Sequence, residues 1–394
     1  MKFTFQNPTQ LIFGAGTLSQ LGEVVIAHGK KALLVTGGGS IKRNGTFERA
    51  VSSLNASGVS FVECSGVEPN PRISTVARGA EIAHDEGCDV VVAIGGGSTM
   101  DAAKVMAAAV FYEGDPWNMM VHQADRKMPE RALPIITVPT LAATGSEMNA
   151  GAVITDEKTT VKSFVSAKCM YPRTAIVDPE LTLTVPLDQT AFGICDLITH
   201  VTESYFNGVD GTPLQDRFAE SVILTAIEWG ARAIADGKDL EARAQVQWAS
   251  VVALNGWVQV GALAPYPVHM IEHSLSAHHD IAHGAGLAVV NPAWMRFAAR
   301  TRPARYARFA QQIFGVSLKH PEDAVAAAEG IGLFEAFLRE IGCPTRLSEV
   351  GIGDDLLARY AQDTVLVAHD DQGRLPGRPP MSQEDIVEVL RTAL

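Results

Sequence analysis

The stretch DVVVAIGGGSTMDAAK, at residues 89–104, decides the fold of this chain. Its first six residues form an apolar, valine-rich run that predicts a buried β-strand, and a helical pattern begins at residue 101. Between the two lie three glycines and Ser98. Glycine lets the backbone approach a phosphate closely, and the amides at a helix N-terminus attract an anion. The stretch therefore predicts a strand–glycine–helix junction that binds a phosphate group.

A second glycine run, TGGGS at residues 36–40, follows another apolar strand. Two such junctions in one parallel sheet favour a dinucleotide across the carboxyl ends of the strands. Neither run is a GxGxxG motif, because Met100 stands where the third glycine would fall, and a tight turn explains a single GGGS equally well. A third loop, PTLAATGSEMN at residues 139–149, offers hydroxyls and amides to the same phosphates. Its alternative role is a helix N-cap at Thr144 or Ser146.

Short apolar or β-branched runs predict a parallel sheet in the first half of the chain, with strands at residues 31–36, 59–63, 89–94, 133–138 and 174–177. Helical patterns at residues 74–86 and 101–111 separate several of these runs, and this alternation is typical of buried parallel strands joined by helical crossovers. Residues 2–5 and 10–13 predict an edge hairpin, or an arm to a partner subunit in a homodimer.

The strand signals stop near residue 186. From there, helical periodicity or helix-forming composition is found at residues 187–206, 214–235, 241–261, 265–275, 286–301, 304–314, 321–341, 353–362 and 382–392. A chain of 394 residues exceeds what one hydrophobic core usually serves. We therefore expect an α/β dinucleotide-binding domain at residues 1–185 and an all-helical domain at residues 186–394.

The composition excludes several classes of protein. No apolar run reaches the ~18 residues of a membrane helix, and residues 1–10 lack the basic start and apolar core of a signal peptide. The expected location is therefore cytoplasmic. The five cysteines are scattered and form no CxxC pair, which indicates reduced structural thiols. A formal net charge of -12 argues against nucleic acid and anionic lipid as general partners.

Five of the eleven histidines lie within residues 268–284: His269, His273, His278, His279 and His283. On one straight helix, His269 and His273 would share a face, whereas His283 would lie ~21 Å further along the axis than His269. A metal binds at about 2 Å from an imidazole nitrogen. One ion therefore joins His269 and His283 only if the chain turns between them, and residues 274–280 are the expected turn. Ordinary surface or core histidines are the alternative for each one taken alone.

Asp196 and His200 lie four residues apart, on one face of the first helix of the helical half. A carboxylate and an imidazole are a normal pair of metal ligands, although DxxxH alone is a weak signal. Together with the histidine stretch, the pair gives the candidate ligands of one divalent ion: Asp196, His200, His269 and His283. His273 remains as a further imidazole beside His269. Residues 186–394 thereby become the expected metal-binding and catalytic domain.

In these motifs the chain resembles the iron-type (group III) alcohol dehydrogenases, which have the dehydroquinate-synthase-like fold. The resemblance covers nearly the whole chain through LIFGAG at 11–16, EPNP at 68–71, GGGSTMDAAK at 95–104, PTLAATGSE at 139–147, DPELT at 178–182 and DLITH at 196–200. Within this family, the chain is most similar to the branch of butanol dehydrogenases and broad-range NADPH-dependent aldehyde reductases. This similarity rests on TGGGSIKRNG, WNMM, ATGSEMNAGAVI, QDRFAE and LNG.

The resemblance implies a Rossmann-like α/β N-terminal domain, an all-α C-terminal domain and the same four metal ligands. It implies pyrophosphate contacts from residues 95–98, Thr140 and Thr144, a ribose or nicotinamide contact from Lys162, and adenine packing against Leu181. The full set of expected cofactor-binding residues is Gly37, Gly38, Gly39, Ser40, Asn70, Gly95, Gly96, Gly97, Ser98, Asp101, Thr140, Leu141, Thr144, Asn149, Lys162 and Leu181.

The loop after the first core strand bears on the choice of cofactor. Many family members that prefer NAD have an acid there, which holds the adenosine ribose diol and repels a 2'-phosphate. This chain has Gly39 and then Ser40, with Lys42 and Arg43 close by. A hydroxyl, amides and cations suit a phosphate and lack the acceptor that a diol needs. NADP(H) is therefore expected over NAD(H); a solvated turn is the alternative role for Lys42 and Arg43.

The ligand set also predicts the chemistry. Three neutral imidazoles and one carboxylate leave a divalent ion with an excess charge of about +1, which polarises a carbonyl oxygen as hydride reaches the aldehyde carbon. The side chain of His273, with an unperturbed pKa near neutral, is expected on the proton path. The ligand set accepts several divalent metals, and members of the family occur with iron or zinc, so the expected ion is Fe(II) or Zn(II).

Asn149, Trp257, Tyr266, Val268 and His273 are candidate substrate-pocket residues, but for Trp257 burial in the helical core is the favoured account. Their apolar neighbours favour small to medium aliphatic aldehydes and primary alcohols. The same fold serves NAD-dependent polyol dehydrogenases, a sugar-phosphate lyase that needs more basic residues near the ligands, and metal-free maleylacetate-type reductases, against which four ligands argue. A non-catalytic nucleotide- or metal-binding protein is the alternative from another class.

Overall fold

The computed structural model describes residues 2–262, 264–318 and 322–394, and the chain divides into two compact units. The sheet unit comprises Gln6–Val185 and Gly237–Val251; the helical unit comprises Met1–Phe5, Pro186–Asp236 and Val252–Leu394. The sequence predicted a single boundary after residue 185. In the structure, residues 1–5 belong to the helical unit and residues 237–251 to the sheet unit. The second segment belongs to the sheet unit because Val251 packs against Ala175 and Val177. The functions expected of the two domains stay predictions.

The sheet unit is built on a parallel sheet with the strand order β1-β8-β5-β4-β2-β3. The bounds of its strands are β1 Gln10–Phe13, β2 Lys31–Gly37, β3 Ser60–Val67, β4 Val90–Gly95, β5 Ile135–Pro139 and β8 Thr174–Val177. The chain runs from β2 out to the edge strand β3 and returns to the other side of β2 for β4. The carboxyl ends of β2 and β4 therefore form a topological switch point, where open α/β sheets bind their ligands.

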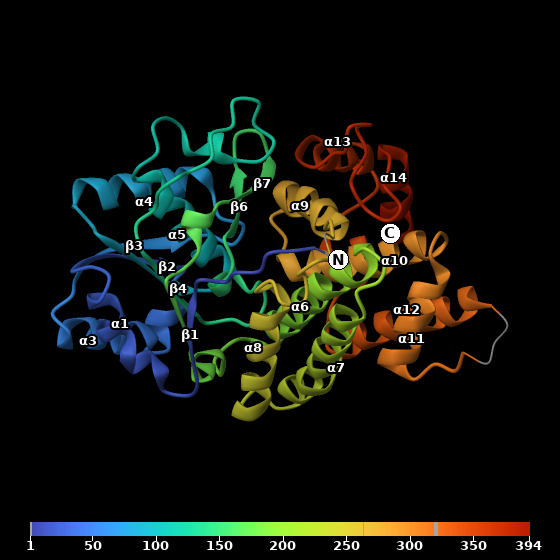
Figure 1. The fold of residues 1–394 in the computed structure, drawn as a ribbon, viewed down its shortest axis with the longest axis horizontal. Helices are drawn as coiled ribbons and strands as arrows, with labels where there is room; N and C mark the ends of the chain where they lie inside the picture. The colour runs from blue at the N-terminus through green and yellow to red at the C-terminus, as the bar shows by residue number, and fades with distance from the viewer. Residues whose placement is uncertain (1, 263, 319–321) are drawn as a thin grey trace. The chain divides into compact units, whose positions relative to one another are not determined.

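Helices cover both faces of this sheet. They are α1 Leu21–Ile26, α2 Ser40–Arg43, α3 Thr46–Ala56, α4 Ile73–Asp85 and α5 Gly97–Ala109. Figure 1 shows α1 and α3 on one face and α4 and α5 on the other. Leu21 of α1 and Leu54 of α3 pack with Leu34 of β2 and Val92 of β4 in one fully buried cluster. Because successive strand residues alternate between faces, the intervening residues face α4 and α5.

Two features of the sheet unit differ from the sequence-based expectation. The predicted edge hairpin is wrong: residues 2–5 form no strand, and β1 pairs in parallel with β8, more than 160 residues away in the chain. An antiparallel hairpin that the sequence reasoning missed joins β6 Gly151–Asp156 to β7 Val161–Ser166. Pairing between distant segments, which local alternation does not encode, decides the first of these differences.

The helical unit contains α6 Leu187–Asn207, α7 Pro213–Ala235, α9 Pro267–His279, α10 His283–Ala299, α11 Pro303–Phe314, α12 Asp323–Glu340, α13 Leu357–Val367 and α14 Gln383–Thr392. Helix α8 Leu240–Leu254 lies mostly in the sheet unit. The core of the helical unit is aromatic: Phe206 of α6 stacks on Tyr306 of α11 with 4.0 Å between ring centroids, and Trp294 of α10 is fully buried beside Phe206.

Three helical boundaries correct the sequence reading. The helix expected at residues 241–261 ends at Leu254. The turn expected at residues 274–280 is helical up to His279, and only Asp280, with a left-handed φ of 52°, ends the helix. The helix expected from residue 321 is seen from Asp323, since residue 321 lies outside the described residues. Among the helices that the structure describes, none is long and apolar enough to cross a membrane.

Candidate metal centre and nucleotide site

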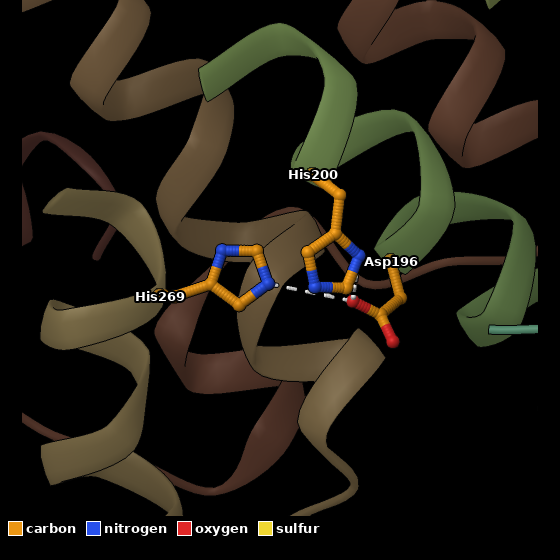
Figure 2. Close-up of side chains that lie close together, drawn as sticks. All are labelled: Asp196, His200 and His269. Carbon is orange, nitrogen blue, oxygen red and sulfur yellow. Dashed lines mark ion pairs between the residues drawn. The ribbon is translucent and has the colours of Figure 1, made fainter. Parts of the chain in front are cut away.

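Two helices of the helical unit bring the candidate ligands together. Asp196 and His200 lie one turn apart on α6, so both project from the same face. His269 is the third residue of α9, and Figure 2 shows its ring pointing toward the two α6 side chains. His283 is the first residue of α10, and only three residues separate it from the end of α9. The turn at residues 280–282 therefore returns the chain to the same place.

The ligand atoms converge on one carboxylate oxygen. Asp196 Oδ1 lies 3.3 Å from His200 Nδ1, 3.5 Å from His269 Nε2 and 3.9 Å from His283 Nε2. Two atoms that bind one ion at ~2.1 Å with tetrahedral angles lie about 3.4 Å apart. The spacing of the cluster is therefore that of a mononuclear site for a divalent metal.

The hydrogen bonding of these atoms tests whether a metal fits. Asp196 Oδ1, His200 Nδ1 and His269 Nε2 are buried and have no hydrogen-bond partner. Together with their mutual distances, this makes Asp196, His200 and His269 a group able to hold an ion. A buried polar atom without a partner costs about 1–3 kcal/mol, so three in one place call for a ligand. Nitrogen and carboxylate donors suit a divalent transition metal.

The electrostatics of the cluster favour a cation. Burial alone would raise the pKa of Asp196, but the imidazoles of His200, His269 and His283, which are protonated at the acid pH where this carboxyl titrates, hold it well below its usual range. Burial lowers the pKa of His200 to about 3, which keeps that imidazole neutral with its lone pair available. Burial lowers the pKa of His269 as well, but the Glu203 and Asp196 charges outweigh it and raise the pKa to about 9. A metal ion would replace that proton at the imidazole.

Two glutamates stand behind the histidines, and sequence reasoning missed both. Glu203 Oε2 contacts His269 Nδ1, and Glu272 Oε2 contacts His283 Nδ1; both carboxylates are fully buried. A signal for Glu203 was present, because it lies three residues after His200 and seven after Asp196, on the same helix face. Glu272 likewise lies three residues after His269. An acid on the buried face of a helix is rare unless it has a partner.

The other three histidines of the stretch lie in two places. His273 is buried next to the ligands, with 5.6 Å between its ring centroid and that of His283. His278 Nε2 lies 2.8 Å from Asp363 Oδ2, and His279 Nε2 lies 2.5 Å from the Tyr360 hydroxyl, so both pair with α13. Their lack of a metal role and the proton-path role of His273 stay predictions.

The candidate pocket residues of the helical unit differ in burial and in distance from the ligands. Tyr266 lies beside the ligands, with 5.7 Å between its ring centroid and that of His269, and its hydroxyl is 3.0 Å from Ser204 Oγ. Val268 is fully buried. Trp257 is 51% exposed and packs against the Phe5 ring, so its expected burial in the helical core is wrong.

In the sheet unit, the three expected phosphate loops meet at the carboxyl ends of β2, β4 and β5. Gly95 closes β4, and α5 begins at Gly97. A Cβ on Gly97 would lie 2.3 Å from Thr144 Cγ2, so only glycine lets the 140–145 loop pack onto the start of α5. Thr140 N donates to Gly95 O at 2.9 Å, and a Cβ on Gly37 would lie 3.3 Å from Thr99 Oγ1. The expected pyrophosphate residues are thus neighbours.

The remaining expected cofactor residues form two groups. Lys162 Nζ donates to Asn70 Oδ1 at 2.8 Å, and Asn70 has a left-handed φ of 53°, so the EPNP loop and β7 meet at this buried pair. Leu181 is 3% exposed and packs in the cluster with α1, α3, β2 and β4. Contact of these residues with a nucleotide stays a prediction.

Asp101 and Asn149 belong to a buried hydrogen-bond network within the sheet unit. Lys104, which is fully buried, donates to Ser146 Oγ at 2.8 Å, Asn149 Oδ1 at 3.1 Å and Gly151 O at 2.8 Å. Asp101 accepts from Ser146 Oγ at 2.5 Å and from the Val153 amide at 2.9 Å. The side chains of Asp101 and Asn149 thus already have protein partners, which is a structural use that the sequence did not reveal.

The two cations after the first glycine run have different environments. Lys42 Nζ lies 2.5 Å from Glu63 Oε1 and over the Phe47 ring. Arg43 Nη1 would lie 3.5 Å from a Cβ atom placed on Gly39. Gly39 has a φ of 92°, so an acid at this position would be strained. Arg43 is thus the cation beside the glycine loop.

Comparison with known proteins assigns both halves of the chain to one family. The family model of iron-containing alcohol dehydrogenases matches residues 8–179, and the model of the C-terminal part of the Fe-containing alcohol dehydrogenase family matches residues 190–394. The chain belongs to the iron-containing alcohol dehydrogenase family. Members of this family are oxidoreductases of the alcohol and aldehyde type that use a nucleotide cofactor and a metal, and this chain has the corresponding fold.

Relatives of this chain cover nearly its whole length. It is 40% identical to NADH-dependent butanol dehydrogenase A of Clostridium acetobutylicum over 99% of both chains. It is 34% identical to the NADPH-dependent aldehyde reductase YqhD of Escherichia coli, over 89% of each. The crystal structure of NADH-dependent butanol dehydrogenase A from Thermotoga maritima has a TM-score of 0.95 and 40% identity, and the match covers 100% of this chain and 98% of that one.

Proposed function

We propose that this alcohol dehydrogenase transfers hydride between NADP(H) and an aldehyde/primary alcohol pair of small to medium aliphatic size. Asp196, His200, His269 and His283 would hold one divalent ion, Fe(II) or Zn(II). The observation that carries the proposal is the convergence of buried donor atoms without hydrogen-bond partners on Asp196 Oδ1. When bound, the dinucleotide supplies hydride and the ion polarises the carbonyl oxygen.

The residues of the chain then have distinct roles in the reaction. Asp196 supplies one negative charge against three imidazoles, which leaves a divalent ion with an excess charge of about +1. His273, one helical turn after His269 and buried beside His283, holds or passes the proton of the alcohol oxygen. The fully buried Val268 and the adjacent Tyr266 ring exclude water from the side of His269.

The proposed preference for NADP(H) rests on the loop at residues 37–40. It contains no acid, and the left-handed φ of Gly39 disfavours one. Arg43 lies beside this loop, whereas Lys42 is paired with Glu63. The names of the relatives point both ways, since the butanol dehydrogenases are named NADH-dependent and the aldehyde reductase NADPH-dependent. Arg43 is therefore the residue to test.

Arg43→Gln should lower kcat/KM with NADPH by about 10- to 100-fold, because one charge-assisted contact to the 2'-phosphate is lost. The value with NADH should change little. Lys42→Gln is the matched control, and it should leave the ratio of the two cofactors nearly unchanged because Glu63 already holds that cation. Faster turnover with NADH than with NADPH in the parent protein would overturn the preference.

The substrate class follows the relatives' names, butanol dehydrogenase and aldehyde reductase. The test is oxidation of NADPH with a series of straight-chain aldehydes, before and after complete chelation and then after adding back Fe(II) or Zn(II). We expect activity to disappear on chelation and to return with one of the two ions. Activity that survives complete metal removal would contradict the proposal. We also propose a homodimer, since β1 is an edge strand of the described sheet, and sedimentation would test it.

A further inference from the structure

We infer that Glu203 and Glu272 are positioning residues of the metal centre, each of which fixes one ligand histidine so that its Nε2 atom faces the ion. The inference rests on the proposed metal site but concerns two residues that are not among its four proposed ligands. Glu203 contacts Nδ1 of His269, and Glu272 contacts Nδ1 of His283. Both carboxylates are fully buried.

The choice of nitrogen follows from the chemistry of the contact. An ionised carboxylate only accepts hydrogen bonds, so the Nδ1 atom that faces it carries the proton. The proton on Nδ1 leaves the lone pair on Nε2. In both histidines Nε2 is the atom that faces Asp196, at 3.5 Å for His269 and 3.9 Å for His283. The two glutamates therefore select the tautomer that a metal needs.

Glu203 also fixes the helix that carries His269. One oxygen of its carboxylate accepts from the Val268 amide at 2.5 Å, and the other lies 3.4 Å from the His269 amide, in the first turn of α9. Amides in the first turn of a helix lack intrahelical partners, and a carboxylate there is favoured by the helix dipole. Because Glu203 lies on α6 with Asp196 and His200, one side chain holds the start of α9 against the helix that supplies the other ligands.

Glu272 connects α9 to α10 across the turn between them. It lies on α9 and reaches His283, the first residue of α10. Space for its carboxylate comes from Gly286, since a Cβ there would lie 2.7 Å from Glu272 Cγ and 2.8 Å from Oε1. A Cβ on Gly284 would lie 2.2 Å from the Phe192 carbonyl oxygen, so the start of α10 also packs directly on α6.

The third histidine has a different arrangement, which makes it an internal reference. His200 lies in the middle of α6, and its Nδ1 faces Asp196 without a hydrogen bond. The long helix itself fixes its backbone. The two histidines in the first turns of α9 and α10 are the ones that contact a glutamate.

The test measures metal affinity, which does not depend on turnover. The metal-free parent protein, Glu203→Gln and Glu272→Gln are titrated with Zn(II) against a chromophoric chelator, and with Co(II) for the visible spectrum of the ion. Each substitution should raise the Kd for the metal by about 10- to 100-fold, because loss of a carboxylate behind a ligand histidine has that effect. Glu220→Gln is the matched control: this buried glutamate pairs with Tyr205 and Arg308, so its loss should leave the Kd unchanged.

A second pair of variants keeps every charge. Gly286→Ala should displace the Glu272 carboxylate and raise the Kd in the same direction as Glu272→Gln. Gly332→Ala, in α12, is its control, because a Cβ there meets no atom within 4 Å. This pair answers the question even if a buried glutamine lowers the stability of the protein.

Two results would overturn the inference. The first is a Kd within threefold of the parent value in both glutamine variants. The second is complete loss of the ion in Glu272→Gln, as in His283→Ala, since Glu272 would then be a ligand. Failure of the proposed metal site gives a different pattern: the parent protein binds no ion, or His283→Ala binds it as tightly as the parent.

Discussion

Two buried polar clusters of this protein differ in one respect that decides how each is interpreted. In the sheet unit, Lys104 makes three hydrogen bonds, and both oxygens of Asp101 accept one. In the helical unit, Asp196, His200 and His269 are equally buried, but each has a polar atom without a hydrogen-bond partner. Burial and charge are similar in the two clusters, and hydrogen-bond satisfaction is not.

The difference shows why a buried charged residue is not by itself a functional site. The Lys104 cluster completes its hydrogen bonds within the protein, so it ties α5 to the 144–151 segment and needs no further ligand. The Asp196 cluster gains its missing partners only from outside the chain. Four substitutions can break or sharpen this contrast.

The largest effect is expected for His200→Ala, which removes one unsatisfied donor of the helical cluster. The bound ion should be lost on dialysis, and aldehyde reduction should fall by about 10³-fold, the upper range for loss of one transition-state-stabilising group. Metal content and NADPH oxidation measure both. His278→Ala is the control, because His278 pairs with Asp363 and should leave the ion in place. An active, fully metallated His200→Ala protein would contradict the assignment of the Asp196 cluster as a metal site.

Lys104→Met should act on stability instead. It leaves Asp101 without its nearby cation and removes the donor of three buried acceptors, which should lower the free energy of unfolding by about 3 kcal/mol. Urea unfolding of the metal-free protein measures this, and metal affinity in the folded state should not change. Lys31→Met, which removes only an exposed pair with Glu86, should have little effect. Equal stability of the two variants would contradict a structural role for the Lys104 cluster.

His273→Ala tests the buried histidine that adjoins the metal cluster. Turnover should fall by about 100-fold, because a positioned acid or base contributes about that much or more. The ion should remain bound. If the variant loses its metal, His273 is a ligand and the assignment of the four ligands is wrong. Metal analysis and steady-state kinetics on the same preparation separate these outcomes.

The smallest effect concerns the pH dependence of stability in the sheet unit. Burial raises the pKa of Glu147 from its ordinary value of 4.5 to about 7. Between these two values the folded protein binds more of this proton than the unfolded chain, so this group lowers stability as the pH rises from 4.5 to 7. Glu147→Gln should remove that loss, and the variant should gain about 2 kcal/mol on the parent between pH 4.5 and 6.5. Parallel pH profiles of unfolding would refute the assignment.

Much of the candidate site could be predicted from the sequence because its parts are local. The spacing of Asp196 and His200 places both on one helix face, and an apolar run followed by three glycines predicts the junction of β4 and α5. The need for a turn before His283 also follows from helix geometry. Its position did not, because the stretch 274–280 contains turn-forming residues and the helix nevertheless continues to His279. Packing against α13, through His278 and His279, accompanies that extension.

By itself, the sequence determined which segments are strands and helices over most of the chain, the class of chemistry, and the four candidate ligands. The strands, the helices and the Asp196–His200 pair depend on periodicity and spacing within a few residues, whereas the class of chemistry follows from motifs that resemble those of the family. The tertiary structure alone decided that β1 pairs with β8, that Asp101 serves a hydrogen-bond network, and that Glu203 and Glu272 stand behind the histidines. These depend on contacts between segments far apart in the chain or on opposite sides of a turn. Whether a buried polar atom has a partner is such a property, and it separates the two clusters.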